Sequence, residues 1–470
     1  MMVQKILSEK EILNLNSIKL EIFSDTIWEG VKLLDGIADN SNYLDCVGHY
    51  LNNLESPTYF FKEKNKKNFF SVKVCGRYQD WKLSNDVDNL VNDIDKPDFI
   101  FFNKIKNKII LAGETTDTIS LGNSELQRKG RIIASAKKKI PFIYKTFGTK
   151  TDDSALTYKE RLQGKIGEPR YLSSWSIIFH LILSIRYKVP SLLSIIQNPE
   201  SDKKIDFKIN NGGSDFFYDY ISLIILAQNK NVNDDLNKIL FKIFKENINY
   251  LKNSHGNESL IEKIKIEPVS KIIKNKSDTL LKNLIHHLNN NTKKIDETLK
   301  FTKWEYDSFF FWKNGYLTSN NVTNNLNWFF REVIKDKNIK SYGYKKTTSR
   351  ICITPNTDQL IKLLVRNTKI KETELLKKLN INLPTLIIPT LAFQWRDINN
   401  FKVNKVDPGT GELCYFSEFF SLDDDSKKIA NVLVYIYVKS PNNSIPKNKL
   451  FKAIKKYQDC LIINNKIINI

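Results

Sequence analysis

The sequence predicts a mixed α/β fold, of the α+β kind, in which a mixed N-terminal sheet is flanked by helices. Two observations predict it. Short apolar runs bounded by polar turns, typical of strands, recur before residue 150, and Phe69–Cys75 is the clearest. Segments with apolar residues at helical spacing alternate with these runs. A chain of 470 residues, at roughly 150 residues per domain, has room for about three domains.

The predicted elements of residues 1–150 are, in order, a helical part of two helices, three strands, a helix and a strand. Two apolar runs separated by the polar turn Lys104–Asn107 are typical of a β-hairpin, and Ser124 can cap the helix that follows them. The predicted helices are Asp25–Leu34, Tyr43–Leu54 and Ser124–Lys138, and the predicted strands are Phe69–Cys75, Asp98–Asn103, Lys108–Glu114 and Ile140–Phe147.

Two further regions follow this one. Residues 151–297 predict an almost wholly helical domain, and residues 298–470, where strands and aromatic residues return, predict an α+β domain for DNA recognition. Two places in the last region suit winged-helix elements. One is the pair of short helices Thr357–Val365 and Lys371–Leu379, and the other is the helix Lys447–Tyr457 followed by a hairpin that turns at Asn464-Asn465.

The charge of the chain makes a polyanion the first partner to consider. Lys and Arg number 73 against 52 Asp and Glu, which gives a net charge of +21. Each phosphate that a lysine neutralises releases a condensed counterion, so such a surplus favours nucleic-acid binding. The chain is also rich in Lys, Asn and Ile throughout, and a general drift toward Lys would raise the charge without any partner. The charge alone therefore does not establish nucleic-acid binding, and a site in the sequence is needed as further evidence.

The cysteines and the apolar segments predict a cytoplasmic protein without a membrane span. The five cysteines are scattered and form no C-x-x-C pair, which predicts neither a zinc ribbon nor a disulfide framework. The N-terminal residues carry acidic side chains before any apolar core, unlike a signal peptide. The most apolar segment, Tyr171–Val189, contains His180, Arg186 and Lys188, which favour a buried helix over a span.

Two carboxylates lie at the ends of the predicted hairpin strands. Asp98 opens one strand and Glu114 closes the next. Adjacent antiparallel strands bring such positions to the same end of a sheet, and two hard oxygen ligands suit Mg²⁺. A metal there would help to generate hydroxide and would neutralise charge on a reacting phosphate. Carboxylates at strand ends are also frequent on ordinary surfaces, so the pair alone is weak evidence.

The whole arrangement resembles the PD-(D/E)XK nuclease superfamily, the restriction-endonuclease-like fold, over about residues 25 to 150. The residues that carry the resemblance are Lys96-Pro97-Asp98 on one strand, Gly113-Glu114-Thr115-Thr116 on the next, and Gln127-Arg128-Lys129-Gly130-Arg131 on the following helix. The resemblance implies that Asp98 and Glu114 bind Mg²⁺ and that the main-chain carbonyl of Thr115 is a further ligand. It also implies an endonuclease of double-stranded DNA, of type II restriction or anti-phage defence type, often a homodimer.

One position departs from the family pattern. The E-x-K lysine is replaced by Thr116. Lys129 on the following helix is our first candidate for a migrated lysine, with Arg128 and Arg131 as alternatives. Gln127 and Arg131, four residues apart, share one helical face. Because Lys129 lies about 200° around the helix from both, either Lys129 or the Gln127–Arg131 face points at the metal. A solvated basic face is the simpler interpretation, and Lys73 is the candidate if this helix contributes nothing.

The superfamily also tends to place an acidic residue on the helix before the first strand. Glu29 matches that position best, and Asp45 is the alternative. Two other functions stay open beside a nuclease. The chain could be a non-catalytic DNA-binding protein whose nuclease fold has lost its lysine, or a nuclease subunit that acts with partner proteins in a larger defence complex.

Overall fold

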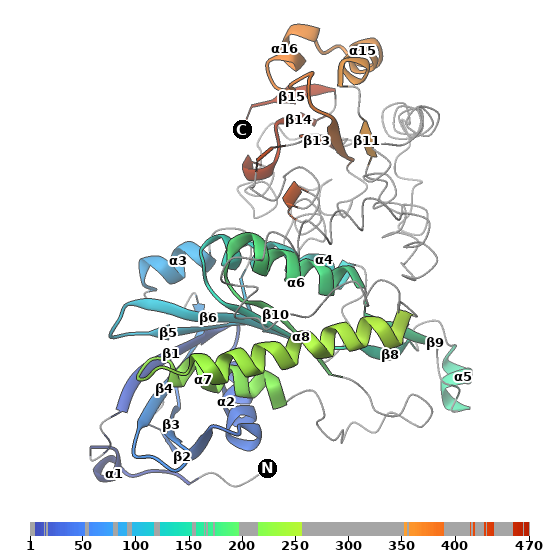
Figure 1. Ribbon diagram of the computed structural model, residues 1–470. Helices are drawn as coiled ribbons and strands as arrows, with labels where there is room; N and C mark the ends of the chain where they lie inside the picture. Colours follow the sequence, from blue (N-terminus) through green and yellow to red (C-terminus); the bar gives the residue numbers. More distant parts are fainter. Residues whose placement is uncertain are drawn as a thin grey trace. The chain divides into compact units, whose positions relative to one another are not determined.

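The structure is a computed structural model in which the protein forms two compact units (Figure 1). The first comprises Met1–Asn92, Lys96–Leu121 and Arg131–Leu280, and the second comprises Asp93–Asp95, Gly122–Gly130 and Leu281–Ile470. The structure describes residues 5–13, 15, 17–51, 56–78, 83–91, 96–116, 123–152, 157–163, 165, 168–172, 174–196, 215–255, 352–354, 357–389, 414, 417–418, 427–428, 430–436, 455–463 and 465–469.

An eight-stranded mixed sheet forms the centre of the first unit. β6 pairs parallel with β7, and β7 with β10, whereas β5 is antiparallel to both of its neighbours, β6 and β1. β1 and β6 therefore end, and β5 begins, at the same end of the sheet. The strands in sheet order are β10 (Ser191–Ile196), β7 (Phe142–Phe147), β6 (Lys108–Thr115), β5 (Phe99–Asn103), β1 (Ser17–Ser24), β4 (Phe69–Arg77), β3 (Thr58–Glu63) and β2 (Leu44–Tyr50).

Helices cover both faces of this sheet (Figure 1). One face carries α2 (Ile27–Asn40), α7 (Asp215–Leu226) and α8 (Asn233–His255), and the other carries α3 (Asn85–Val91), α4 (Asn123–Lys137) and α6 (Ser174–Tyr187). The remaining elements of the first unit are α1 (Glu9–Leu13), the pair β8 (Thr149–Asp152) and β9 (Glu168–Tyr171), and α5 (Tyr158–Leu162). The predicted sheet flanked by helices is thus confirmed.

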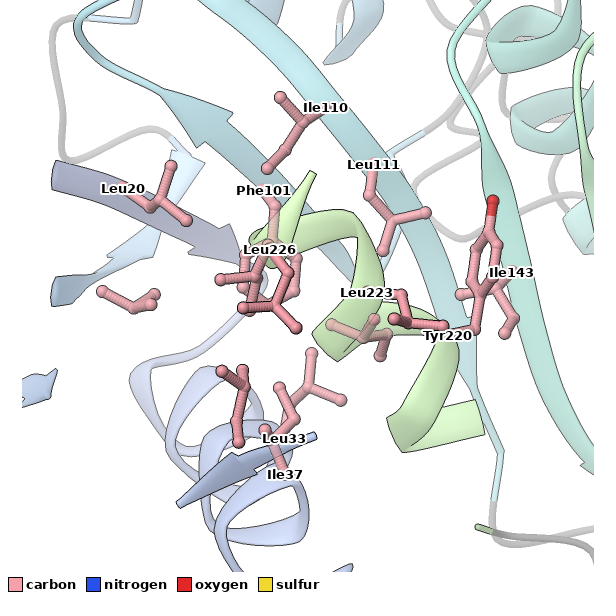
Figure 2. Packing of buried hydrophobic residues seen from close by; sticks show 14 of the residues in the cluster. Leu20, Leu33, Ile37, Phe101, Ile110, Leu111, Ile143, Tyr220, Leu223 and Leu226 are labelled. Carbon is pink, nitrogen blue, oxygen red and sulfur yellow. The ribbon is translucent and has the colours of Figure 1, made fainter. Parts of the chain in front are cut away.

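The apolar core on the α2 and α7 face shows why β6 can present a carboxylate on its other face. Leu111 of β6 and Ile143 of β7 pack with Leu33 of α2 and with Tyr220 and Leu223 of α7 (Figure 2). Successive side chains of a strand point to opposite faces. The positions that alternate with Leu111 along β6 and with Ile143 along β7 therefore face α4 and α6.

Glu114 of β6 is one of the strand positions that face α4 and α6. It pairs in register with Tyr144 of β7, whose ring lies 6.2 Å from that of His180 on α6. His180 is itself buried and its Nδ1 lies 3.0 Å from Oγ of Ser191. Glu114 is therefore placed on the α4 and α6 face, in surroundings that are otherwise apolar or hydrogen-bonded.

The second unit contains its own five-stranded sheet, with α15 (Thr357–Asn367) and α16 (Glu372–Leu376). The predicted C-terminal hairpin is confirmed, since β14 and β15 pair antiparallel and Asn465 takes a positive φ of 62° between them. The two predicted helices near residues 357–379 are also present. The winged-helix interpretation stays a prediction, and residues 447–454 of its last helix lie outside the described residues. The sheet order is β11 (Cys352–Thr354), β12 (Thr385–Pro389), β13 (Asn431–Ile436), β14 (Cys460–Ile463) and β15 (Lys466–Ile468).

One predicted element before residue 150 is wrong, and two strands are absent from the prediction. Tyr43–Leu54 is wrong as a helix: its apolar residues recur at helical spacing, but residues 44–50 form β2, which pairs with β3. Gly48 there approaches the backbone of Lys5 so closely that a Cβ would lie 2.4 Å from its carbonyl oxygen. The sequence also missed β1 and β3, and β1 separates β4 from β5 in the sheet.

The middle region is not wholly helical either. Ser191–Ile196 is a buried strand, β10, in the same sheet as β7, so this sheet continues beyond residue 150. A short, fully buried apolar run carries no periodicity that separates strand from helix. The limits 150 and 297 stay predictions. Within the part of the chain that the structure describes, no helix has both the length and the apolar character needed to span a membrane.

Candidate functional site

Two carboxylates meet at the end of the sheet where β6 ends and β5 begins. The backbone N–H of Asp98 donates to Oε2 of Glu114 at 3.3 Å, and the backbone N–H of Thr115 donates to Oδ2 of Asp98 at 2.9 Å. Each carboxylate is thus held by the backbone of the opposite strand. The predicted approach of Asp98 and Glu114 is confirmed, and its cause is the antiparallel pairing of β5 with β6.

A cation from α4 lies on both carboxylates. Nη1 of Arg131 is 2.6 Å from Oε1 of Glu114 and 3.3 Å from Oδ1 of Asp98. The side chain of Glu114 is 1 % exposed and that of Arg131 8 %, whereas that of Asp98 is 21 % exposed. A buried carboxylate needs such a partner, because an isolated charge would lose its hydration without compensation. The site is therefore open to solvent on the Asp98 side.

Glu29 lies close enough to share the electrostatics of the pair. It occupies the first turn of α2, where its carboxylate accepts from the N–H of Thr26 at 3.1 Å and the Thr26 hydroxyl accepts from its own N–H. This capping box fixes the start of α2 directly after β1. Partial burial, and then the negative charge of Asp98, raise the pKa of Glu29 although the side chain keeps contact with solvent. Asp25 contributes in the same direction.

Tyr78 supports the segment that leads into Asp98. Its hydroxyl donates to the carbonyl of Pro97 at 2.8 Å, and its ring stacks on Phe23 of β1 with centroids 6.5 Å apart. Burial raises the pKa of Tyr78 well above its ordinary value, and the charges of Asp25, Asp98 and Glu114 add to the rise. Tyr78 is therefore a neutral hydrogen-bond donor that positions Pro97.

The other predicted residues are placed as follows. Thr116 is buried and its N–H donates to the carbonyl of Lys145 at 3.0 Å, so it continues the pairing with β7. Lys129 is 2 % exposed and precedes Arg131 on α4 by two residues, which sets it about 200° around the helix. Arg128 lies on the same helix and is half-buried. The structure does not describe the side chain of Gln127.

Two alternatives lie away from the carboxylate pair in the sheet. Asp45 belongs to β2, the edge strand that β1, β4 and β3 separate from β5, so it cannot be the helical acid of the site. Lys73 lies on β4, which pairs with β1 and not with β5. Of the two α4 faces considered from the sequence, the structure brings Arg131 to the carboxylates.

Asp98 and Glu114 supply oxygen donors of the kind that a small, hard cation takes. Oxygens of Asp98 and Glu114 both lie within 3.3 Å of one nitrogen, Nη1 of Arg131, so they converge on a position that already holds positive charge. The backbone of Thr115 lies next to the carboxylate of Asp98, since its N–H donates to Oδ2. Among the residues that the structure describes, no group of three or more His, Cys, Asp and Glu side chains forms a metal site. Two carboxylates with backbone and water oxygens are nevertheless a usual Mg²⁺ ligand set.

Sequence reasoning missed Tyr78 and Asp25 and ranked Arg131 below Lys129. Tyr78 is 20 positions before Asp98 and follows a different strand, so no local spacing connects the two. Asp25 carries a weak signal, because it directly follows an apolar run and precedes a helix cap. No protein-family model, no curated protein and no solved structure matches this chain.

Proposed function

We propose that this protein is a Mg²⁺-dependent endonuclease that hydrolyses phosphodiester bonds of double-stranded DNA, of restriction or anti-phage defence type. The observation that carries the proposal is the convergence of Asp98 and Glu114, from two adjacent strands, on one cationic position at a solvent-open end of the sheet. The resemblance of residues 96–131 to the PD-(D/E)XK pattern assigns the same two residues.

In this proposal each residue of the site has its own role. Asp98, Glu114 and the carbonyl of Thr115 would hold the metal. When bound, Mg²⁺ supplies a lowered pKa for its water and neutralises charge on the phosphate. The missing E-x-K lysine is replaced by a cation of α4, and Arg131 is now the first candidate because it touches the pair, with Lys129 the second. A guanidinium can donate to two phosphate oxygens together.

Charge and an exposed aromatic residue support DNA as the substrate. The net charge of +21 favours a polyanion. Trp28, next to Glu29 in the first turn of α2, is 78 % exposed, and a tryptophan in this position can stack on a base. Residues 298–470 are proposed to select the sequence. Because one carboxylate pair hydrolyses one strand at a time, cutting both strands favours a homodimer. The cytoplasm is the compartment that fits this role.

The test is cleavage of supercoiled plasmid by the purified chain with Mg²⁺ and with a chelator. We expect cutting with Mg²⁺ only, and loss of cutting in Asp98→Asn and Glu114→Gln with DNA binding retained in a gel-shift assay. The matched control is Asp86→Asn, which removes an exposed carboxylate from α3 and should cut normally. Near wild-type cutting by Asp98→Asn would show that the assignment is wrong.

One observation favours a second candidate. Arg131 already places a positive charge on the pair, which is what a DNA-binding protein with a degenerate nuclease fold would need once its metal is lost. This alternative predicts DNA binding that neither Mg²⁺ nor the loss of Asp98 changes, and no cutting of any plasmid. A chain that cuts only after a partner protein is added would instead support a nuclease subunit of a defence complex.

A further inference from the structure

We propose that Arg131 is the resident counter-ion of the Asp98–Glu114 pair and that it competes with a divalent cation for these carboxylates. A metal ion then enters the pair only as the guanidinium leaves Glu114. The inference rests on the proposed function in one respect, since it takes the pair to be the metal site. It goes further because it assigns a counter-ion to the pair and makes metal binding an exchange of cations.

The two cations would draw on the same carboxylate oxygens. Nη1 of Arg131 lies 2.6 Å from Oε1 of Glu114 and 3.3 Å from Oδ1 of Asp98. Mg²⁺ takes carboxylate oxygens at about 2.1 Å with near-octahedral geometry. An ion bound to these oxygens would share them with the guanidinium, and two positive charges so close together at a poorly hydrated site repel each other. The guanidinium and the metal therefore compete for the carboxylates.

The burial of Glu114 makes a counter-charge important. Its side chain is 1 % exposed, so water compensates little for the loss of the Arg131 contact. A buried carboxylate without a counter-charge is strongly unfavourable. Arg131 therefore keeps the pair folded and close together, ready for a metal, and lowers its affinity for the metal by the same interaction.

The exchange can take place within the side chain of Arg131. The backbone of this part of α4 is held, because Ile132, Ile133 and Ala134 are buried and Ser135 Oγ donates to the carbonyl of Arg131 at 2.9 Å. Release therefore means rotation of the long side chain off both carboxylates and past Asp98 toward solvent, because Asp98 is the more exposed of the two. A DNA phosphate next to Asp98 would accept hydrogen bonds from the released guanidinium, whose donor geometry matches a phosphate group. Metal and DNA should thus bind with positive coupling, since each favours the released state.

The experiment measures Mn²⁺ affinity by isothermal titration calorimetry on the full chain, without DNA. We expect Arg131→Gln to bind Mn²⁺ at least tenfold more tightly than the wild type. Arg131→Lys, which keeps the charge but contacts the pair through one ammonium, should lie between the two. Lys108→Gln removes an exposed cation from the other end of β6 and should leave the affinity within twofold.

Folding provides the second measurement. Arg131→Gln should lose thermal stability in the absence of metal and regain it with Mn²⁺, because the ion replaces the missing counter-charge. If Arg131→Gln does not fold without metal, the Mn²⁺ affinity of Arg131→Lys is compared with that of the wild type, and this comparison alone tests the inference. Equal or weaker Mn²⁺ binding in the Arg131 variants that fold would overturn the inference.

The outcomes separate this inference from the proposed function. Metal-dependent cutting by the wild type with no gain of affinity in the variants would overturn the competition and leave the nuclease standing. Mn²⁺ binding by Arg131→Gln but not by a wild type that never cuts would support the competition and refute the nuclease. No Mn²⁺ binding by any variant and no cutting would refute both.

Discussion

The guanidinium of Arg131 lies 2.6 Å from Oε1 of Glu114, and both side chains are almost fully withdrawn from solvent. This ion pair links α4 to the end of β6. It joins a residue that the family pattern assigns to the metal with one that the pattern does not require. The stability of this end of the sheet should therefore depend on both partners together.

A double-mutant cycle should show this dependence. Glu114→Gln or Arg131→Met alone removes one partner of a buried ion pair and should cost about 3–5 kcal/mol. The double variant should cost less than the sum, with a coupling energy of about 0.5–3 kcal/mol. Hydrogen exchange of peptides from β5 and β6 measures these values locally.

The control for this cycle is Lys165→Gln, which breaks the exposed pair between Lys165 and Glu160 at 3.3 Å. It should leave the exchange of β5 and β6 unchanged. Costs of Glu114→Gln and Arg131→Met that simply add would show that the two side chains do not depend on each other.

The raised pKa of Glu29 predicts a pH dependence of stability. In the folded protein Glu29 keeps its proton to higher pH than in the unfolded chain, because of its burial and the charge of Asp98. Its contribution to stability is therefore full at pH values below its unfolded pKa and is lost as the pH rises through the raised value. Glu29→Gln removes this loss, so it should be more stable than the wild type at pH 7 and equal to it at low pH. The gain should be small because the carboxylate keeps contact with solvent.

Glu11 is the control of opposite sign. Hydrogen bonds from Lys5 and Ser8 lower its pKa to about 2, so its contribution is present at neutral pH and is lost on acidification. Thermal unfolding of Glu11→Gln should show a loss at pH 7 that disappears near pH 2. A Glu29→Gln variant with the same pH profile as Glu11→Gln would contradict the electrostatic role of Asp98.

Gly113, next to Glu114, should not tolerate any side chain. A Cβ there would lie 2.1 Å from Cζ of Phe99 and 2.6 Å from the carbonyl oxygen of Ile143. Because the second contact is backbone of β7, the strands themselves must move. Gly113→Ala should cost at least about 1–3 kcal/mol, the usual range for overpacking, and should lower the melting temperature of the protein.

Gly30 on α2 provides the matched comparison. Its Cβ would meet only side-chain atoms, Cγ1 of Val74 at 2.9 Å and Oγ of Ser24 at 3.2 Å. These atoms can shift, and alanine gains about 1 kcal/mol in helix propensity over glycine. Gly30→Ala should therefore be close to neutral. An equal loss in both variants would mean that β6 and β7 are not packed as closely as the structure shows.

The affinity for DNA should fall steeply with salt if the charge of +21 serves binding. The logarithm of the affinity falls by about 0.9 per phosphate contacted for each unit of log salt. Fluorescence anisotropy with a labelled duplex, at salt concentrations from about 50 to about 200 mM, measures this slope. A slope shallower than about −2 would attribute the charge to a general richness in lysine.

Much of the region around the site could be predicted from the sequence. The hairpin of β5 and β6 follows from two apolar runs and a polar turn, and α4 follows from the helical spacing of its apolar residues. The helix begins at Asn123, so the predicted cap Ser124 lies inside it. The helix predicted for Tyr43–Leu54 is wrong. The local spacing of its apolar residues suits a helix, but pairing with β3 makes residues 44–50 a strand. Local periodicity reports which faces of a segment are apolar and says nothing of the partner that covers them.

By itself the sequence determined that Asp98 and Glu114 share one end of a hairpin, because the turn and the strand lengths are local features. Only the tertiary structure decided the rest of the site. It placed β1 beside β5, which brings Glu29 near Asp98, and it turned Arg131 onto both carboxylates. The rotation of a helix against a sheet depends on all the side chains buried between them, and strand order depends on contacts between residues far apart in the chain. Neither leaves a signature in the local spacing of the sequence.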